Sequence, residues 1–312
     1  MAGLTPVLGA WLQRGEFFGV RGQRLFVIRE GRGPVLMLLH GYPTSSWDWH
    51  RIWMPLTAHF TLVAPDLLGM GFSAKPAHHS YSLKAQADLV DALAQRLGIH
   101  RMHVVAHDLG VTVAQELLAR RQADGSLPRI DSLVLLNGGV CPEAYEPRPI
   151  QRLLISPLGR WLGPRIPQRS FERAITSVFA PGSPPAQDLL DNFWALVSHG
   201  HGRRVTHRVG KIWHERQALR DRLVAPLVEG AVPVRLINGA LDPNSGAHMA
   251  RRYREVVPDA DIVSLPEVGH WPQLEAPDAV VRAMLAFAPL QRAAPQAAPQ
   301  AAPMFGTSVP AG

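Results

Sequence analysis

Three residues of the sequence could together supply a nucleophile, an acid and a base. Asp108 stands in "VVAHDLGVTVAQEL", between an apolar run that predicts a strand and an amphipathic stretch that predicts a helix. Asp242 follows an apolar run in "INGALDPNSG", and His270 follows another in "LPEVGHW". The chain order of nucleophile, acid and histidine, each at the end of a strand, is one of the known orders of a catalytic triad.

Asp108 has two competing interpretations. An Asp just before a helix commonly accepts hydrogen bonds from the backbone N–H groups of the first turn, so Asp108 could be a helix cap. Ala106 and Gly110 favour a nucleophile, because a sharp strand-to-helix bend leaves room only for small neighbours. Asp also tolerates a left-handed backbone better than most residues do.

Asp242 and His270 also have simpler alternatives. Asp242 could form a turn before Pro243, and His270 could be a packed loop residue beside Trp271. The other strand end that could carry the acid holds Asn137, which cannot ionise. Asp242 is therefore the acid that we expect to orient His270.

A loop near Asp108 could supply a site for a negatively charged oxygen. The run "LLHGYP" ends a predicted strand, and its loop can direct the backbone N–H of Tyr42 toward the same point as the N–H of Leu109. Two converging N–H groups make an oxyanion hole. We therefore expect the oxyanion hole at these two residues.

A carboxylate nucleophile restricts the chemistry. It is a weaker nucleophile than a serine alkoxide and suits displacement at an sp³ carbon, which leaves a covalent ester. His270, oriented by Asp242, would then activate a water that attacks the carboxyl carbon of Asp108. Epoxides, which open to diols, and alkyl halides are substrates that fit this chemistry.

The surrounding pattern predicts an α/β fold with a doubly wound, mostly parallel sheet. A hairpin that turns near Arg21-Gly22 precedes an alternation of buried strands and helices. From about Cys141 to Val232 this rhythm stops, and short apolar helical pieces rich in Pro and Arg predict a helical cap. The expected units are a core over 15–140 and 233–290, a cap over 141–232, and a disordered Ala/Pro/Gln-rich tail over 291–312.

Composition bounds the class of protein. The single cysteine, Cys141, rules out an internal disulfide framework, and we expect it to be a small apolar filler. Net charge is +7, of which the stretch from Cys141 to Glu229 supplies +5, with thirteen basic and eight acidic residues. This excess of positive charge either belongs to an ordinary solvated surface or attracts anionic substrates or membrane headgroups.

No motif predicts nucleic-acid binding, a leader peptide or a membrane span, and we expect a cytoplasmic protein.

Several motifs resemble the α/β-hydrolase superfamily, specifically its epoxide hydrolase and haloalkane dehalogenase branch. The resemblance covers about Gly19 to Leu290, and "HGYP" followed by "HDLG" is similar to the paired motifs of epoxide hydrolases. It implies that fold, with Asp108 as nucleophile and the cap as that family's cap domain. Within the branch, the motifs "HGYPTSSWDW", "DLLGMGFSAKP", "AHDLGVTVAQELL" and "LNGGVCPE" resemble the mesoderm-specific transcript protein group most closely.

The chain departs from the resemblance where a leaving group would be held. Haloalkane dehalogenases usually place Trp after the nucleophile, where this chain has Leu109, and their common Asn after His-Gly is Tyr42 here. Epoxide hydrolases usually use two cap tyrosines, but Tyr145 is the only tyrosine in the expected cap. Candidate substitutes for the missing donors are Trp194, Trp213 and His214.

These observations predict an epoxide hydrolase-like enzyme that acts on a small apolar or amphipathic substrate. A haloalkane dehalogenase is the alternative enzyme, and a catalytically silent binding or scaffold protein with the same fold is the alternative of another class. No cofactor or metal is expected, because "GMGFSA" lacks the helix of a dinucleotide site and the histidine clusters lack carboxylate or Cys partners. The sequence does not specify the oligomeric state.

Overall fold

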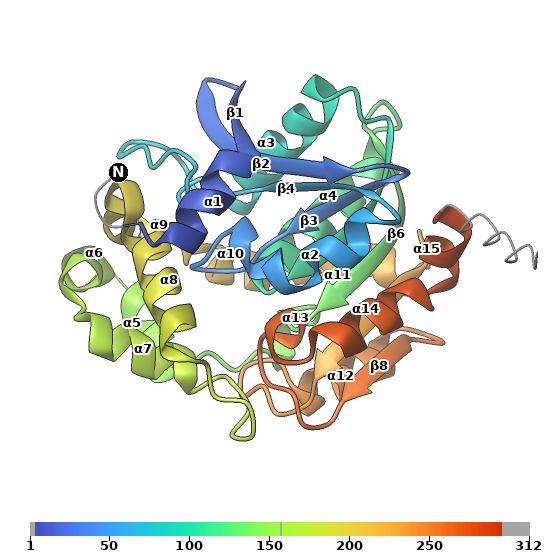
Figure 1. Cartoon of the computed structure of the whole chain (residues 1–312). Coiled ribbons are helices and arrows are strands. Elements are labelled where there is room, and N and C mark those ends of the chain that lie inside the picture. Colours follow the sequence, from blue (N-terminus) through green and yellow to red (C-terminus); the bar gives the residue numbers. More distant parts are fainter. Residues whose placement is uncertain (1–3, 157, 295–312) are drawn as a thin grey trace, which may run out of the picture.

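The computed structural model describes residues 4–156 and 158–294. One sheet of eight strands lies at its centre, in the order β1-β2-β4-β3-β5-β6-β7-β8 (Figure 1). The expected tail lies outside the described residues from 295 onward, and its first residues are still helical in α15. The strands are β1 (Gly15–Val20), β2 (Gln23–Gly31), β3 (Val35–Leu39), β4 (Thr61–Pro65), β5 (Arg101–His107), β6 (Arg129–Leu136), β7 (Val234–Gly239) and β8 (Asp261–Leu265).

The pairing confirms a doubly wound, mostly parallel sheet. Strands β3 to β8 pair in parallel, whereas β1 and β2 form an antiparallel hairpin whose β2 pairs antiparallel with β4. The hairpin turns at Arg21 and Gly22, both with positive φ, as its sequence predicts.

Helices cover both faces of the sheet. Side chains of β5 alternate between the two faces, so that Val104 packs into one apolar core and Val105 into the other. One face is covered by α3 (Leu83–Arg96), α4 (Leu109–Ala123) and α12 (Ala247–Val256). The other is covered by α1 (Pro6–Arg14), α2 (His50–Thr57), α13 (Pro272–Glu275), α14 (Pro277–Leu285) and α15 (Ala288–Ala293).

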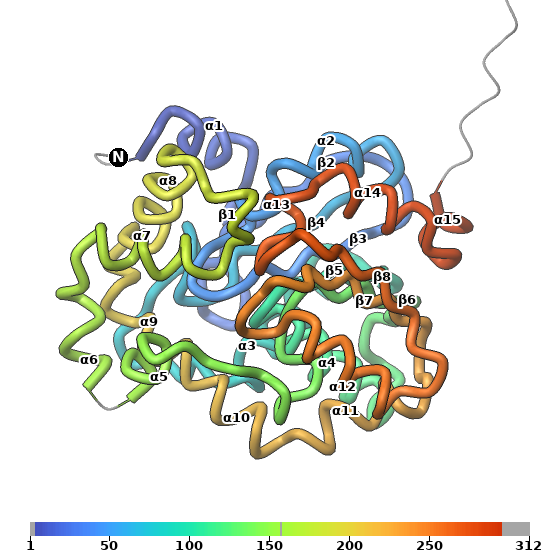
Figure 2. Tube along the Cα trace, turned by 90° about the horizontal axis from the view of Figure 1, so that it is seen from below, coloured from blue at the N-terminus to red at the C-terminus, as the bar shows by residue number. Residues whose placement is uncertain are grey.

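The segment between β6 and β7 contains helices and no strand among its described residues. We use "cap segment" for residues 141–232. Figure 2 shows α5 to α9 gathered at one end of the molecule, beyond the sheet. The helices are α5 (Pro149–Ile155), α6 (Gly159–Leu162), α7 (Gln168–Thr176), α8 (Gln187–Ser198), α9 (Thr206–Val209), α10 (Ile212–Ala218) and α11 (Arg220–Val228).

The last helix of the cap segment belongs with the sheet rather than over a pocket. Leu223 and Leu227 of α11 join the same apolar core as α4, and α11 packs against α4. None of the described helices is long and apolar enough to cross a membrane.

Candidate active site

Asp108 lies on a tight bend between β5 and α4. Its φ is 49° and its ψ is −112°, a positive-φ conformation that a non-glycine residue adopts only when its surroundings impose it. A Cβ at Gly110 would collide with the carbonyl oxygen of Leu39, and a Cβ at Gly41 would collide with the side chain of Asp108. The small neighbours therefore allow the bend to form, as a nucleophile elbow requires.

The carboxylate of Asp108 does not cap α4. No hydrogen bond joins it to the first turn of this helix, which contradicts the cap interpretation. Its Oδ2 instead accepts a hydrogen bond of 2.9 Å from the N–H of Tyr42, and its Oδ1 lies 3.9 Å from Nε2 of His270. Leu109 opens α4, so its N–H has no carbonyl four residues earlier within the helix.

His270 is held between the two carboxylates. Its Nδ1–H donates to Oδ2 of Asp242 over 2.8 Å, which leaves Nε2 toward Asp108. Burial alone would lower the pKa of His270, but the charge and hydrogen bond of Asp242 raise it to about 9. His270 is 4% exposed.

Asp242 is buried and fully hydrogen-bonded. Its Oδ2 accepts from Ser245 Oγ at 2.6 Å and from Asn137 Nδ2 at 3.0 Å, and its Oδ1 accepts from the N–H of Asn244 at 2.8 Å. Burial would raise the pKa of this carboxyl, but the charge of His270 lowers it to about 2. Asp242 therefore does both things that the sequence suggested: it forms a turn before Pro243, and it holds His270.

Asn137 has a role that the sequence analysis missed. It is the residue that could not serve as the acid, yet its amide donates to Asp242 and its Oδ1 accepts from the N–H of Gly239 at 2.7 Å. It thereby joins the ends of β6 and β7. The signal in the sequence for Asn137 was its position directly after a strand, as Asp242 comes shortly after another strand.

Two further histidines hold the loops around the site. His107 Nε2–H donates to the carbonyl of His270 over 2.8 Å, and burial lowers the pKa of His107 to about 3, so it stays neutral. His40 donates from Nδ1 to the carbonyl of Gly41 at 2.7 Å and accepts at Nε2 from the N–H of Leu67 at 2.9 Å. Both histidines hold backbone next to Asp108 and His270, and neither lines the large or the small cavity described below.

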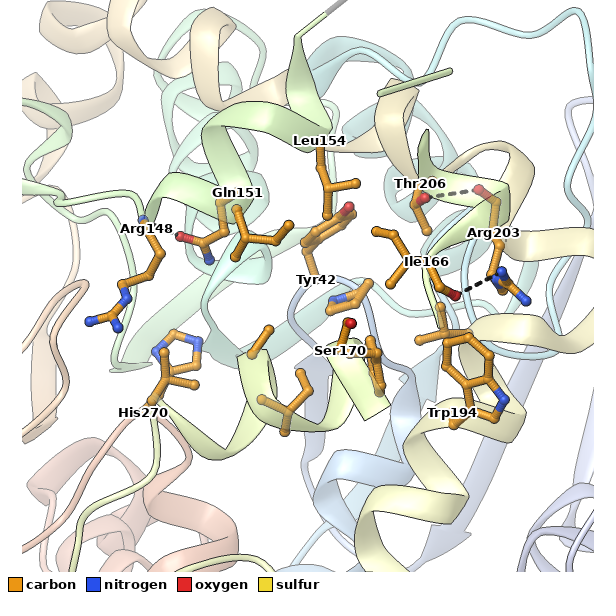
Figure 3. A pocket seen from close by; sticks show the side chains of 18 of the residues that line it. Tyr42, Arg148, Gln151, Leu154, Ile166, Ser170, Trp194, Arg203, Thr206 and His270 are labelled. Atoms are coloured by element: carbon orange, nitrogen blue, oxygen red, sulfur yellow. Dashed lines mark hydrogen bonds between the residues drawn. The ribbon is translucent and has the colours of Figure 1, made fainter. Parts of the chain in front are cut away.

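A cavity of about 270 Å³ lies between His270 and the cap segment. We call it the large cavity. Figure 3 shows His270 and Trp194 on opposite sides of it, with Tyr42 between them. Most of its other walls are apolar and come from the cap segment: Ile150, Leu154, Ile166, Phe171, Ala174, Ile175, Val178 and Val197.

A second cavity, of about 60 Å³, lies on the other side of Tyr42 and reaches Asp108. We call it the small cavity. Asp108 and Leu109 form its core-side wall, and Tyr145, Trp213 and Arg216 form much of the wall from the cap segment. Tyr42 and Gln151 line both cavities, so the two adjoin.

The donors expected in the cap segment divide between these cavities. Tyr145 and Trp213 line the small cavity, and the hydroxyl of Tyr145 accepts a hydrogen bond of 2.9 Å from Asn244 Nδ2. Trp194 lines the large cavity, away from Asp108. His214 is exposed and lines neither cavity, so the structure does not bring it to the site.

Arg216 is a residue of the small cavity that the sequence analysis did not select. It is 4% exposed, and its guanidinium stacks on the ring of Tyr145, with Cζ 4.0 Å from the ring centroid. Ile212 and Arg216 are four residues apart in α10 and are both buried, so the signal was a charged residue on the apolar face of a short helix.

Among the residues that the structure describes, no group of three or more His, Cys, Asp or Glu side chains is arranged to hold a metal ion. Cys141 is buried, and burial raises the pKa of its thiol to about 12. The loop with "GMGFSA" precedes α3 by several residues and opens no helix.

Comparisons with known proteins agree with this architecture. Residues 34–277 match the family model described as the alpha/beta hydrolase fold. The mesoderm-specific transcript homolog protein of Bos taurus is 37% identical over 298 residues, which cover 91% of this chain and 88% of the relative. That name states no reaction.

Two solved structures share the fold. Epoxide hydrolase CorEH aligns with a TM-score of 0.72 and 22% identity over 88% of this chain and 99% of its own. The haloalkane dehalogenase DbeA of Bradyrhizobium elkani aligns with a TM-score of 0.75 and 24% identity over 89% of this chain and 99% of its own. At these identities the likeness establishes the fold alone.

Proposed function

The chain belongs to the α/β hydrolase fold family, and we propose that it hydrolyses epoxides to diols through a covalent ester of Asp108. One observation carries this proposal. Oδ2 of Asp108 is held by the N–H of Tyr42, whereas Oδ1 faces His270 and accepts no hydrogen bond from the described residues. One oxygen is therefore positioned by the protein and the other is free to attack.

In the first step, Oδ1 of Asp108 forms a bond to an epoxide carbon, and the bond from that carbon to the epoxide oxygen breaks. The hydroxyl of Tyr145 lines the small cavity beside Asp108 and gives its proton to the departing oxygen. Asn244 Nδ2 donates to the same hydroxyl and stabilises the phenolate that results. The product of this step is a hydroxyalkyl ester of Asp108.

In the second step, Nε2 of His270 takes a proton from a water whose oxygen attacks the carboxyl carbon of Asp108. Negative charge develops on Oδ2, where the N–H of Tyr42 already donates and the N–H of Leu109 is the second expected donor. The ester bond then breaks, His270 returns its proton to the diol oxygen, and the remaining water proton restores Tyr145.

The alternative of a haloalkane dehalogenase has its own support. Trp213 Nε1 is buried without a protein acceptor among the described residues and lines the small cavity, so it could donate to a halide. Leu109 supplies no side-chain donor where that branch usually has Trp. A silent scaffold protein would need neither an unpartnered carboxylate oxygen nor an aligned histidine, so these two features favour an enzyme.

The test is diol formation from styrene oxide by the purified protein and by Asp108→Asn. We expect the wild-type protein to turn over, and the variant to lose at least about 10³-fold in kcat/KM. Asp131→Asn is the control, because Asp131 lies far from the site at the start of β6. Release of bromide from bromoalkanes without any diol formation would favour the dehalogenase, and no turnover with either panel would favour the scaffold. A small apolar or amphipathic substrate and a cytoplasmic location stay predictions.

A further inference from the structure

Arg216 is a buried cation whose charge has no acidic partner of its own. No salt bridge joins it to any described carboxylate, and its Nε and Nη2 have no hydrogen-bond acceptor among the described residues. Arg220 and Arg222 of α11 differ from it, since Arg220 pairs with Glu143 and Arg222 with Glu116. A desolvated, unpaired charge destabilises a fold, so its retention points to a ligand.

The guanidinium lies against Tyr145 and against the backbone at Gly139. One face stacks on the ring of Tyr145, and a Cβ at Gly139 would collide with Nη1 and Cζ. Stacking orients a guanidinium but leaves the donors at its edge unused. The absence of a side chain at Gly139 therefore leaves the space that the guanidinium of Arg216 needs to reach the small cavity.

The other groups of the small cavity favour an anion. Trp213 Nε1 is a second donor without an acceptor, and Tyr145 supplies a hydroxyl. Asp108 is the only carboxylate that lines this cavity, and its charge is lost when it becomes an ester. A substrate that carries its own carboxylate would keep a negative charge beside Arg216 through both steps, independently of the charges that Asp108 and Tyr145 gain and lose.

The surroundings agree with an anionic ligand. The stretch from Cys141 to Glu229 carries a net charge of +5, which attracts anions toward the cavities that it lines. The small cavity, at about 60 Å³, has room for a group of a few heavy atoms, and the apolar large cavity has room for a longer tail.

We propose that the small cavity is a carboxylate subsite in which Arg216 and Trp213 hold a carboxylate that the substrate carries next to its reacting carbon. The inference rests on the proposed function and narrows it to epoxides, or alkyl halides, that bear a carboxylate. Tyr145 keeps its role toward the departing oxygen. The substrate's apolar tail lies in the large cavity.

The kinetic test compares phenylglycidate with β-methylstyrene oxide, in which a methyl group replaces the carboxylate. We expect wild-type kcat/KM to be at least about tenfold higher for the carboxylate substrate. Arg216→Gln should lose about 10- to 100-fold on phenylglycidate and less than about threefold on the neutral epoxide, and Arg216→Lys should recover part of the loss. Lys211→Gln, which removes an exposed cation just before α10, should change neither substrate.

A binding test separates this inference from the proposed reaction. Hydrocinnamate and its amide have the same shape and differ in charge, and neither can react. We expect calorimetry on the Asp108→Asn protein to show tighter binding of the carboxylate, and the preference to disappear in Asp108→Asn/Arg216→Gln. Gly139→Ala, which displaces the guanidinium without removing its charge, should weaken the same preference. Unfolding temperatures of all variants are measured alongside, and removal of an unpaired buried charge should not lower them.

Equal binding of the two ligands, or an equal loss on both epoxides in Arg216→Gln, would overturn the inference. The second result would mean that Arg216 serves only the departing oxygen. Failure of the proposed function is distinct, since it would show as no turnover of either epoxide while the preference for hydrocinnamate persists.

Discussion

The candidate active site has a core wall and a cap wall, and the two are built in different ways. On the core side, Asp108 and the residues that orient His270 lie at the ends of strands, and each makes short hydrogen bonds to neighbouring backbone or side chains. On the side of the cap segment, Trp213 and Arg216 come from α10, a seven-residue helix, and keep donors without acceptors. The core wall is held mainly by the protein's own hydrogen bonds, although Oγ1 of Thr112 has no partner among the described residues. The cap wall keeps several donors that a ligand could satisfy.

This difference assigns different tasks to the two walls. A hydrogen-bonded triad at the edge of a rigid sheet can carry a reaction that is common to many substrates. Unsatisfied donors on short helices would select the substrate and hold its departing or charged groups. Substitutions in the core wall should therefore abolish a step for every substrate, and those in the cap wall should change rates by smaller, substrate-dependent factors.

The strongest test of the core wall is His270→Gln. Loss of the base should leave the first step in place and slow hydrolysis of the ester by about 10³-fold or more. The protein should then gain the mass of the hydroxyalkyl group, which intact-protein mass spectrometry would detect. The absence of an adduct from a substrate that the wild-type protein turns over would contradict covalent catalysis.

A smaller effect is expected from Asp242→Asn. The variant keeps the shape of the side chain but removes the charge that raises the pKa of His270. We expect kcat to fall by about 10²- to 10³-fold, with the pH dependence of ester hydrolysis shifted to lower pH. Steady-state rates across the pH range would measure both, and an unshifted profile would show that Asp242 does not act on His270.

The wild-type pH profile gives a third test. His270 has a pKa raised to about 9, so near neutral pH it holds a proton and only a minor fraction can act as a base. Formation of the ester removes the charge of Asp108, one of the groups that raise this pKa, so the intermediate should titrate lower than the free enzyme. Single-turnover hydrolysis should slow by about tenfold for each pH unit below that pKa. A rate of ester hydrolysis that does not fall as the pH is lowered from about 9 to about 4 would contradict the role of His270.

The smallest effect belongs to the cap wall. Tyr145→Phe removes one donor to the departing oxygen while the core wall stays intact, and kcat should fall by about 10- to 100-fold. The loss should be greater for epoxides than for bromoalkanes, because a departing halide needs no proton. Tyr253→Phe is the control, since Tyr253 belongs to α12, is buried in the core and lines neither cavity. An equal loss on both kinds of substrate would indicate a structural role for Tyr145.

The same contrast explains which residues of the site could be predicted from the sequence. Strict rules govern the ends of parallel strands, so Asp108, Asp242 and His270 could be selected from apolar runs and small neighbours, and the structure brings them together. The fold class followed from the alternation of strands and helices. The sequence analysis did not predict α2, which has only eight residues and contains Pro55, or α1, which has only nine residues.

The cap wall could not be derived in this way. Its helices are short and are joined by irregular turns, so periodicity does not say which faces meet the cavities. His214 was selected and Arg216 was not, although they are two residues apart, and a shift of that size along a helix changes the face that a side chain occupies. Asn137 was set aside as an acid, and its role as a donor depends on a contact between two strands that are far apart in the sequence.

A single turnover in water enriched in ¹⁸O, with enzyme in excess over styrene oxide, tests the ester most directly. The account predicts that the heavy oxygen enters the carboxylate of Asp108, so that mass analysis of the peptide containing "HDLG" shows the label while the diol carries none. Label in the diol and an unlabelled peptide would mean that water attacks the substrate directly, and would contradict the account.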